Sequence, residues 1–303
     1  MSKPEGPINQ VISSLRRLVP ENEKIVIACS GGADSMALLF CAQKTGHKLV
    51  VVHALHDMRP LEEASKDRDL VQKYCKENSL PFREVLVEVK KYTNPSEETY
   101  RILRQSQIRT VGNQEKTFYT ATGHHADDQL ETMLMKLGRG SGLRGFSGIA
   151  EKHKHNDYIT VRPMLSISKE DIYEICKQNN VPFNEDETNK DTKYTRNAIR
   201  NLIVPVLKEV FPDCARKSHE AACVFADAQK LADDSLHDLK KHEVFNLVYD
   251  PNDKWGGKGT CLTIPIEALL LANNITIYEW LRYAFAKLND TPTYVSYDTL
   301  NRE

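Results

Sequence analysis

The sequence predicts an α/β protein with a doubly wound, mostly parallel sheet and a smaller C-terminal helical domain. Short β-rich runs alternate with helix-length segments over the first 185 residues, which is the order of a parallel sheet covered by helices. The runs lack strict apolar–polar alternation, as expected for strands that are buried on both faces. Near residue 212 the alternation stops and mainly helical patterns follow.

The expected strands lie at 24–29, 49–55, 82–89, 117–122 and 159–162. Local chemistry marks two helix starts between them. Asn94 is a capping residue that is followed by a proline, a residue favoured at the first helical position. Ser168 and Asp171 have the spacing of a capping box, which predicts another helix after the last strand.

At 303 residues the chain is long enough for two domains, because a single hydrophobic core usually stops growing below that length. We place the first domain at 1–212 and the second at 213–303. The second is expected to contain helices at 217–244 and 264–288, with a glycine-rich loop at 255–260 between them.

Composition excludes several classes of protein. Hydrophobic content of 40% and charged content of 27% are typical of a soluble globular protein, and no run of about 18 apolar residues is present to span a membrane. The polar segment 1–6 lacks the apolar region of a secretory signal, so a cytoplasmic location is expected. The seven cysteines are an odd number without C-x-x-C spacing, which favours reduced thiols.

A phosphate-binding loop is predicted directly after the first strand, at Ser30-Gly31-Gly32-Ala33-Asp34-Ser35. Adjacent glycines permit a tight turn, and the N–H groups at the start of the next helix face the same point. The serine hydroxyls add donors, whereas Asp34 is suited to hold Mg²⁺ on phosphate oxygens. The alternative is a purely structural strand–helix turn. The Rossmann and Walker patterns are absent.

A second polar cluster opens a later helix. At 100° per residue, His124, Asp128 and Glu131 fall within about 60° of one another on one helix face. Such a group of carboxylates and imidazoles is able to bind an amine, hold magnesium or accept a proton. The alternative is a solvated charged face at a helix start. A glycine- and arginine-rich loop at 137–146 follows.

These motifs resemble known families. Ser-Gly-Gly-x-Asp-Ser is similar to the loop of ATP-pyrophosphatases (the PP-loop family, with the adenine nucleotide alpha-hydrolase-like fold). The two histidines, the acidic cluster and the Arg-Gly-Ser-Gly segment resemble tRNA(Ile)-lysidine synthetases. Further similar stretches lie at 53–59, 97–104 and 186–200, so the similarity spans roughly 20–212. Gly123 departs from the family, in which alanine is frequent at that place.

The resemblance implies an enzyme that uses ATP and Mg²⁺ to adenylate the wobble cytidine of an isoleucine tRNA with a CAU anticodon, which free L-lysine then attacks. The implied catalytic residues are Asp34, Asp128, Glu131, His125 and Arg101, with Asp34 as the metal ligand. The implied nucleotide-binding residues are Ser30, Gly31, Gly32, Ala33, Asp34, Ser35, His53, Arg104 and His124. The second domain is expected to contact the tRNA, and a homodimer is left open.

Alternatives remain for several residues and for the function. Arg196 and Arg200 belong either to a helix face held by Asp186 and Asp191 or to a ligand contact. A basic cluster either follows the tRNA backbone or is a solvated surface; it comprises Lys136, Arg139, Arg144, Lys152 and Lys154. The rival functions are a tRNA thiolase, a small-molecule amide synthetase and a nucleotide-binding module without catalysis.

Overall fold

The computed structural model describes residues 6–57, 61–92, 97–155, 157–185, 195–241, 246–249, 260–263 and 274–288. The chain forms two compact units, each assembled from two segments. The first unit combines Met1–Thr132 with Ile149–Glu220, and the second combines Met133–Gly148 with Ala221–Glu303. The domain boundary that the sequence places after residue 212 stays a prediction.

The first unit contains the predicted sheet, with the strand order β3-β2-β1-β4-β6-β5. All neighbouring strands are parallel except β5 and β6, which are antiparallel, so the predicted fold class is confirmed. The strands are β1 Lys24–Ala28, β2 Lys48–His56, β3 Phe82–Val87, β4 Tyr119–Ala121, β5 Lys152–His155 and β6 Tyr158–Val161. The sequence does not predict β5, because Lys-His-Lys-His has no apolar residue to mark a strand.

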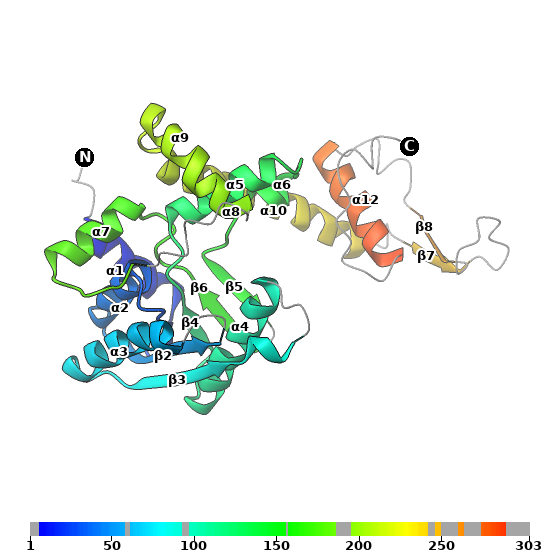
Figure 1. Cartoon of the computed structure of the whole chain (residues 1–303). Coiled ribbons are helices and arrows are strands. Elements are labelled where there is room, and N and C mark those ends of the chain that lie inside the picture. Colours follow the sequence, from blue (N-terminus) through cyan, green and yellow to red (C-terminus); the bar gives the residue numbers. More distant parts are fainter. Residues whose placement is uncertain are drawn as a thin grey trace. The chain divides into compact units, whose positions relative to one another are not determined.

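Helices cover both faces of the sheet (Figure 1). Ile25 and Ile27 of β1 point into a core shared with α1 Pro7–Leu18, α2 Ala33–Gln43, α3 Leu61–Glu77 and α7 Lys169–Gln178. Val26, between them, points to the other face and packs on α4 Glu97–Gln114. Since both faces are covered, the residues of β1 after Lys24 are all apolar, which explains the absence of alternation in the sequence.

Most of the remaining helices of the first unit follow β4 or α7 in the chain. A single parallel bridge, His125 with Met164, extends the pairing of β4 and β6 before α5 Ala126–Leu137 begins. At the start of α7, the Ser168 hydroxyl and the Asp171 carboxylate form the predicted capping box. The other elements are η1 Val89–Lys91, α8 Thr195–Ala198, a π-helical turn η3 Ile199–Ile203, α9 Val204–Val210 and the beginning of α10 Cys214–Lys241.

Side-chain contacts within the second unit join its helix α6 Leu143–Phe146 to α10, the greater part of which belongs to this unit. The unit also contains the antiparallel pair β7 Asn246–Tyr249 and β8 Thr260–Thr263, and α12 Asn274–Leu288. Arg144 binds Asp233 at 2.7 Å, and the rings of Phe146 and Phe225 pack 5.4 Å apart. Most of the predicted glycine-rich loop lies outside the described residues. The described helices include none whose length and apolar content would suit a membrane span.

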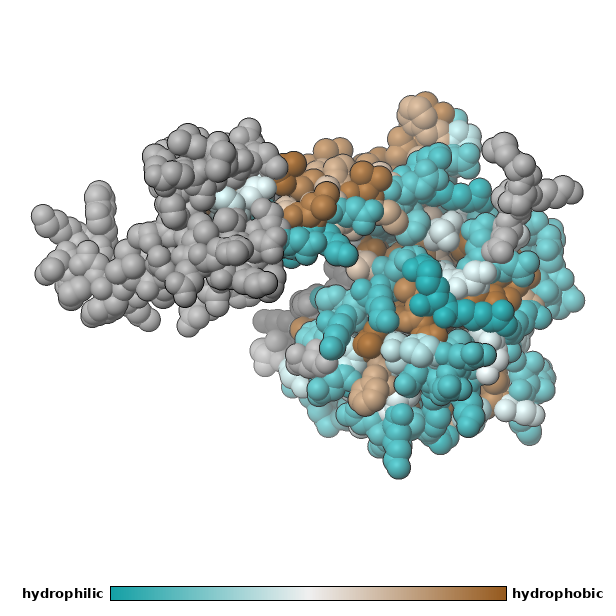
Figure 2. All heavy atoms as spheres, turned by 180° about the vertical axis from the view of Figure 1, so that it is seen from behind, coloured by the Kyte–Doolittle hydropathy of each residue, from teal (hydrophilic) through white to brown (hydrophobic). Residues whose placement is uncertain are grey.

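Five apolar side chains of η3, α9 and the residue that follows are exposed on the first unit. Their exposed fractions range from 48% to 65%, and hydrophobic residues gather over α9 in Figure 2. The residues are Leu202, Ile203, Val206, Val210 and Phe211. Among the described cysteines, Cys29, Cys41, Cys75 and Cys176 are buried, whereas Cys214 is partly exposed and Cys223 is exposed.

The packing of α2 against the sheet gives a stability prediction. Leu38 is fully buried in the core that α2 shares with β1. Leu38→Ala should lower the free energy of unfolding by about 2–5 kcal/mol, because it removes buried methyl groups and leaves a cavity. Val210→Ala, at a side chain that is 65% exposed, should change it by less than about 0.5 kcal/mol. Urea unfolding measures both, and equal effects would contradict the prediction.

Candidate functional site

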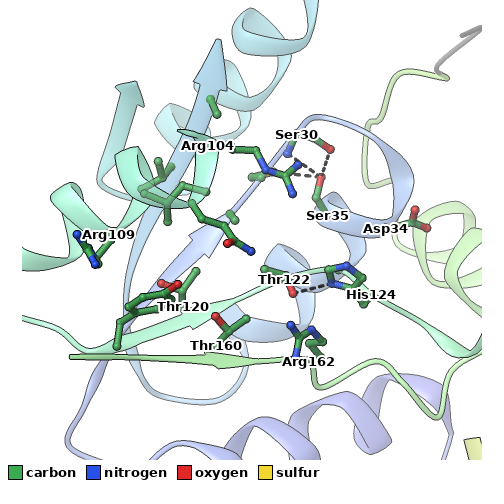
Figure 3. A pocket seen from close by; sticks show the side chains of 18 of the residues that line it. Ser30, Asp34, Ser35, Arg104, Arg109, Thr120, Thr122, His124, Thr160 and Arg162 are labelled. Atoms are coloured by element: carbon green, nitrogen blue, oxygen red, sulfur yellow. Dashed lines mark hydrogen bonds between the residues drawn. The ribbon is translucent and has the colours of Figure 1, made fainter. Parts of the chain in front are cut away.

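A cavity of about 260 Å³ lies at the carboxyl ends of the central strands of the first unit. It is bounded by the loop after β1, by α4 and by the ends of β4 and β6 (Figure 3). This is the edge at which doubly wound sheets bind ligands. Of the residues that the sequence predicts for the site, Ser30, Asp34, Ser35, Arg104, His124 and Asp128 line it.

The loop after β1 has the form that its glycines permit. Gly31 has φ +95°, and a Cβ there would lie 3.2 Å from the Cβ and carbonyl oxygen of Asp67. Ser35 fastens the turn: its hydroxyl oxygen accepts the N–H groups of Ser30 and Gly31 at 3.1 and 3.2 Å. The hydroxyl in turn lies 3.0 Å from the carbonyl oxygen of Gly32, to which it donates. The helix α2 starts at Ala33, directly behind the turn, so its first amides face the cavity edge.

Two further residues hold the loop from outside. Asn184 donates its backbone N–H to the carbonyl oxygen of Gly31 at 3.0 Å and its side-chain amide to Asp67 at 2.8 Å. Neither Asp67 nor Asn184 is predicted from the sequence. No local pattern marks them, because Asp67 lies in a charged helix and Asn184 follows a helix more than a hundred residues later.

Asp34 is placed as a magnesium ligand would be. Its carboxylate is about one-third exposed, and its Oδ1 atom lies 2.5 Å from Nζ of Lys169 and 3.7 Å from Nε2 of His125. Mg²⁺ usually binds to one or two carboxylates, with phosphate oxygens and water completing its shell. Asp34 fits that role. Within the described residues, no group of three or more histidine, cysteine or acidic side chains is arranged to hold a metal alone.

His125 lies among three carboxylates. Its Nε2 is 3.7 Å from Asp34 and 3.6 Å from Asp128, and its Nδ1 is 3.6 Å from Asp127. Burial opposes a positive charge there, but Asp128, Asp127 and Asp34 outweigh it and raise the pKa of His125. Lys208 binds the other oxygen of Asp127. The three carboxylates therefore favour the protonated form of His125 behind the cavity wall.

His124 has the opposite character. Its Nδ1 lies 2.9 Å from the hydroxyl of Thr122, and its ring lines the cavity near Arg162 (Figure 3). Burial, together with the positive charges of Arg162 and Arg104, lowers the pKa of His124 to about 4. The pKa values of the two adjacent histidines are thus shifted in opposite directions: His124 is a neutral ring that faces the cavity, whereas the pKa of His125 is raised.

Glu131 is held by two arginines. It is 1% exposed, and its oxygens accept from Nε of Arg196 at 3.0 Å and from Nε and Nη2 of Arg200 at 2.6 and 3.0 Å. Arg200 also lies 3.4 Å from Asp128. Asp186 and Asp191, the partners considered from the sequence, lie outside the described residues. In the described part of the chain, the acidic face of α5 is what holds these arginines.

The remaining predicted residues have distinct places. Arg104 of α4 points toward the loop in Figure 3, and its guanidinium lies 5.5 Å from the ring centre of Tyr100. Arg101 is exposed on the same helix and does not line the cavity. His53 is buried on β2, where its Nδ1 lies 3.0 Å from the carbonyl oxygen of Cys29, so it ties β2 to β1 behind the loop.

Several cavity residues were not predicted. They are mainly Tyr100, Arg109, Tyr158 and Arg162. Arg162 ends a predicted strand, and that position was the available signal, since ligands bind at the carboxyl ends of such strands. The predicted basic cluster is divided: Lys152 and Lys154 are exposed on β5 in the first unit, whereas Lys136, Arg139 and Arg144 belong to the second. Its role stays a prediction.

Comparisons with known proteins agree with the motifs. A family model described as a PP-loop domain matches residues 5–207. The bifunctional TilS/HprT protein of Listeria monocytogenes is 34% identical over 231 residues, covering 72% of this chain and 35% of the relative. The tRNA(Ile)-lysidine synthase of Enterococcus faecalis is 30% identical over 253 residues, covering 82% and 52%. The chain thus matches about half or less of the length of these relatives.

Among solved structures, a U34-tRNA thiolase from Methanococcus maripaludis, determined with its [4Fe-4S] cluster, has a similar fold. Its TM-score is 0.58 at 17% identity, and the match covers 71% of this chain and 76% of the thiolase. At that identity the likeness concerns the fold alone.

The surroundings of His125 give a prediction on pH. Because the folded state raises its pKa, the stabilisation from the imidazolium is fully present below the ordinary value of 6.5 and is lost as the pH rises through the raised value. His125→Gln should therefore destabilise the protein more at pH 5.5 than at pH 9, as measured by urea unfolding. Val210→Ala, an uncharged change on α9 at a side chain that is 65% exposed, should give equal small effects at both. A larger loss at pH 9 for His125→Gln would refute this explanation.

The Glu131 cluster gives a second prediction. Glu131→Gln leaves two guanidiniums without their buried carboxylate, and this should lower the free energy of unfolding by about 3–5 kcal/mol. Glu220→Gln removes an exposed partner of Lys217 and should cost less than about 1 kcal/mol. Urea unfolding of the two variants measures the contrast. A neutral Glu131→Gln would show that the arginines do not depend on this carboxylate.

Proposed function

The chain belongs to the PP-loop domain family, whose members use ATP, and from that premise we propose that it ligates lysine to a tRNA. Specifically, the enzyme attaches L-lysine to C2 of the wobble cytidine of an isoleucine tRNA with a CAU anticodon, through an adenylated cytidine. The curated relatives named tRNA(Ile)-lysidine synthase support this choice of substrate. Since the chain matches only part of their length, the activity is a proposal for this protein.

One observation carries the proposal: the phosphate-binding loop and the polar start of α5 open into the same cavity. Ser30 and Ser35 lie on one wall, and His124 and Asp128 lie on another. An ATP whose phosphates occupy the loop therefore has its α-phosphate close to side chains that are suited to a second substrate. A loop alone would serve any adenylating enzyme. The shared cavity adds the place for the acceptor and the amine.

The first step is adenylation of the base. The O2 atom of cytosine attacks the α-phosphorus of ATP, an O–P bond forms, and the bond to the bridging oxygen breaks to release pyrophosphate. The N–H groups of the loop and the start of α2 stabilise the charge that develops on pyrophosphate. Arg104 contributes a guanidinium from α4. Asp34 would hold Mg²⁺, which neutralises phosphate charge when bound.

The second step is attack by lysine. The neutral ε-amine of lysine forms a bond to C2, the C2–O2 bond breaks, AMP leaves, and the amine loses one proton. We assign Asp128 to binding an ammonium group of lysine, because it is a carboxylate on the cavity wall. His124 is neutral, so it orients the base by hydrogen bonding. Both oxygens of Glu131 accept hydrogen bonds from Arg196 and Arg200. We therefore assign Glu131 to positioning these two arginines beside Asp128.

The activity assay tests the proposal directly. Purified protein, ATP and labelled lysine should modify an isoleucine tRNA with a CAU anticodon, with one AMP and one pyrophosphate released per lysine. Asp34→Ala should lower kcat/KM by roughly 100-fold or more, because charge stabilisation at the phosphates is lost. Asp213→Ala, at a carboxylate whose side chain is 74% exposed, should leave the rate unchanged.

Two outcomes would refute the assignment. One is the absence of lysine incorporation, and the other is incorporation that survives Asp34→Ala. The rival functions give different products in the same assay. A thiolase would transfer sulfur to the tRNA, whereas an amide synthetase would release AMP with a small-molecule acceptor and no tRNA. The homodimer considered from the sequence stays a prediction.

A further inference from the structure

The cavity face of the sheet continues past the cavity onto the edge strand β5. Tyr158 and Thr160 of β6 line the cavity, as does Arg162 after the strand, and this two-residue spacing places them on one face. In the register of the antiparallel pair, His155 lies opposite Tyr158 and His153 lies opposite Thr160. Opposed residues point to the same side of a sheet. Both histidines therefore share the face of the cavity.

The three rings on this face form a row. The ring of His155 stacks on Tyr158 with centroids 5.3 Å apart and an angle of 11° between the planes. The ring of His153 meets His155 edge-on at 5.9 Å. Both histidines are exposed, whereas Tyr158 is partly buried at the cavity. We call His153, His155 and Tyr158 the ring row, and it runs from the cavity to the open edge of the sheet.

Positive charge accompanies the ring row. The guanidinium of Arg109 on α4 lies 5.9 Å from the centre of the Tyr158 ring, and Arg109 lines the same cavity. Burial lowers the pKa of the His153 imidazole, and the positive charge of the nearby Arg162 lowers it further. Aromatic faces beside arginines are the surface that single-stranded nucleic acid prefers, since bases stack on rings and phosphates bind guanidiniums.

A purely structural explanation covers only half of β5. Edge strands commonly carry lysines that prevent pairing with another chain. Lys152 and Lys154 meet that need, and they alternate with the histidines, so they lie on the opposite face. Lys152 indeed reaches the carbonyl oxygen of Leu18 at the end of α1. Protection of the edge does not explain an exposed, stacked row of rings that continues into the cavity.

We propose that the ring row binds the single-stranded RNA next to the target base, with a flanking anticodon-loop base stacked on Tyr158 and His155 and its phosphate beside Arg109 and Arg162. The inference rests on the proposed function, because it requires that the base in the cavity belongs to an RNA. A base that enters the cavity must leave the stack of its own loop. The ring row replaces that lost stacking for its neighbour.

The test compares Tyr158→Leu with Tyr158→Phe. Loss of one stacking platform should raise the KM for tRNA and the Kd for a CAU anticodon stem-loop by roughly ten-fold. Tyr158→Phe keeps the ring and should stay within about two-fold of the wild type for both quantities. The double variant His153→Ala/His155→Ala should weaken RNA binding in the same direction. Phe211→Leu makes the matched aromatic change at an exposed site away from the cavity and should alter neither quantity.

The outcomes separate this inference from the proposed function. If the wild type transfers lysine and Tyr158→Leu keeps the wild-type KM and Kd, the ring row is not an RNA platform and the function stands. The RNA platform is also excluded if Tyr158→Leu raises the KM for ATP as much as that for tRNA, since the cavity itself would then be damaged. If the wild type transfers no lysine to any tRNA, the proposed function fails, and the RNA platform fails with it.

Discussion

The buried charge network around His125 is the interaction on which the arrangement of the site depends. One imidazole approaches the carboxylates of Asp34, Asp127 and Asp128, which come from the loop after β1 and the start of α5. Each carboxylate also meets a cation from a segment later in the chain. Those cations are Lys169 for Asp34, Lys208 for Asp127 and Arg200 for Asp128. The network thus joins α7, η3 and α9 to the two motifs that face the cavity.

Such a network contributes more to geometry than to net stability. Charges removed from water lose solvation, and their mutual attraction offsets that loss only when partners and hydrogen bonds are well placed. The backbone N–H of Lys169 donates to Asp127 at 2.9 Å while its ammonium binds Asp34, so one residue orients two acids. A divalent cation that binds Asp34 would lie close to this ammonium, which contacts Oδ1.

Features that depend on contiguous residues could be predicted from the sequence, whereas features that depend on residues far apart in the chain could not. The loop at Ser30–Ser35 and the acidic start of α5 are contiguous motifs, and the structure places both at one cavity. Lys169 and Lys208 carry no signal, because their significance arises only when distant helices pack against α5. The same holds for the strands. Apolar runs predict the buried ones, whereas Lys152–His155 is a strand only because β6 offers an unpaired edge.

Selection of the substrate has to depend on the less predictable part. A phosphate-binding loop recognises phosphate through backbone N–H groups, and these are the same whatever the acceptor. Discrimination between acceptors requires side chains that touch the base or its neighbours. Around this cavity, the side chains outside the loop come mainly from α4, β4, β6 and the residues that follow these two strands. Motifs at the loop therefore identify the ATP chemistry, while we expect the walls that carry Arg109, Tyr158 and Arg162 to select the acceptor.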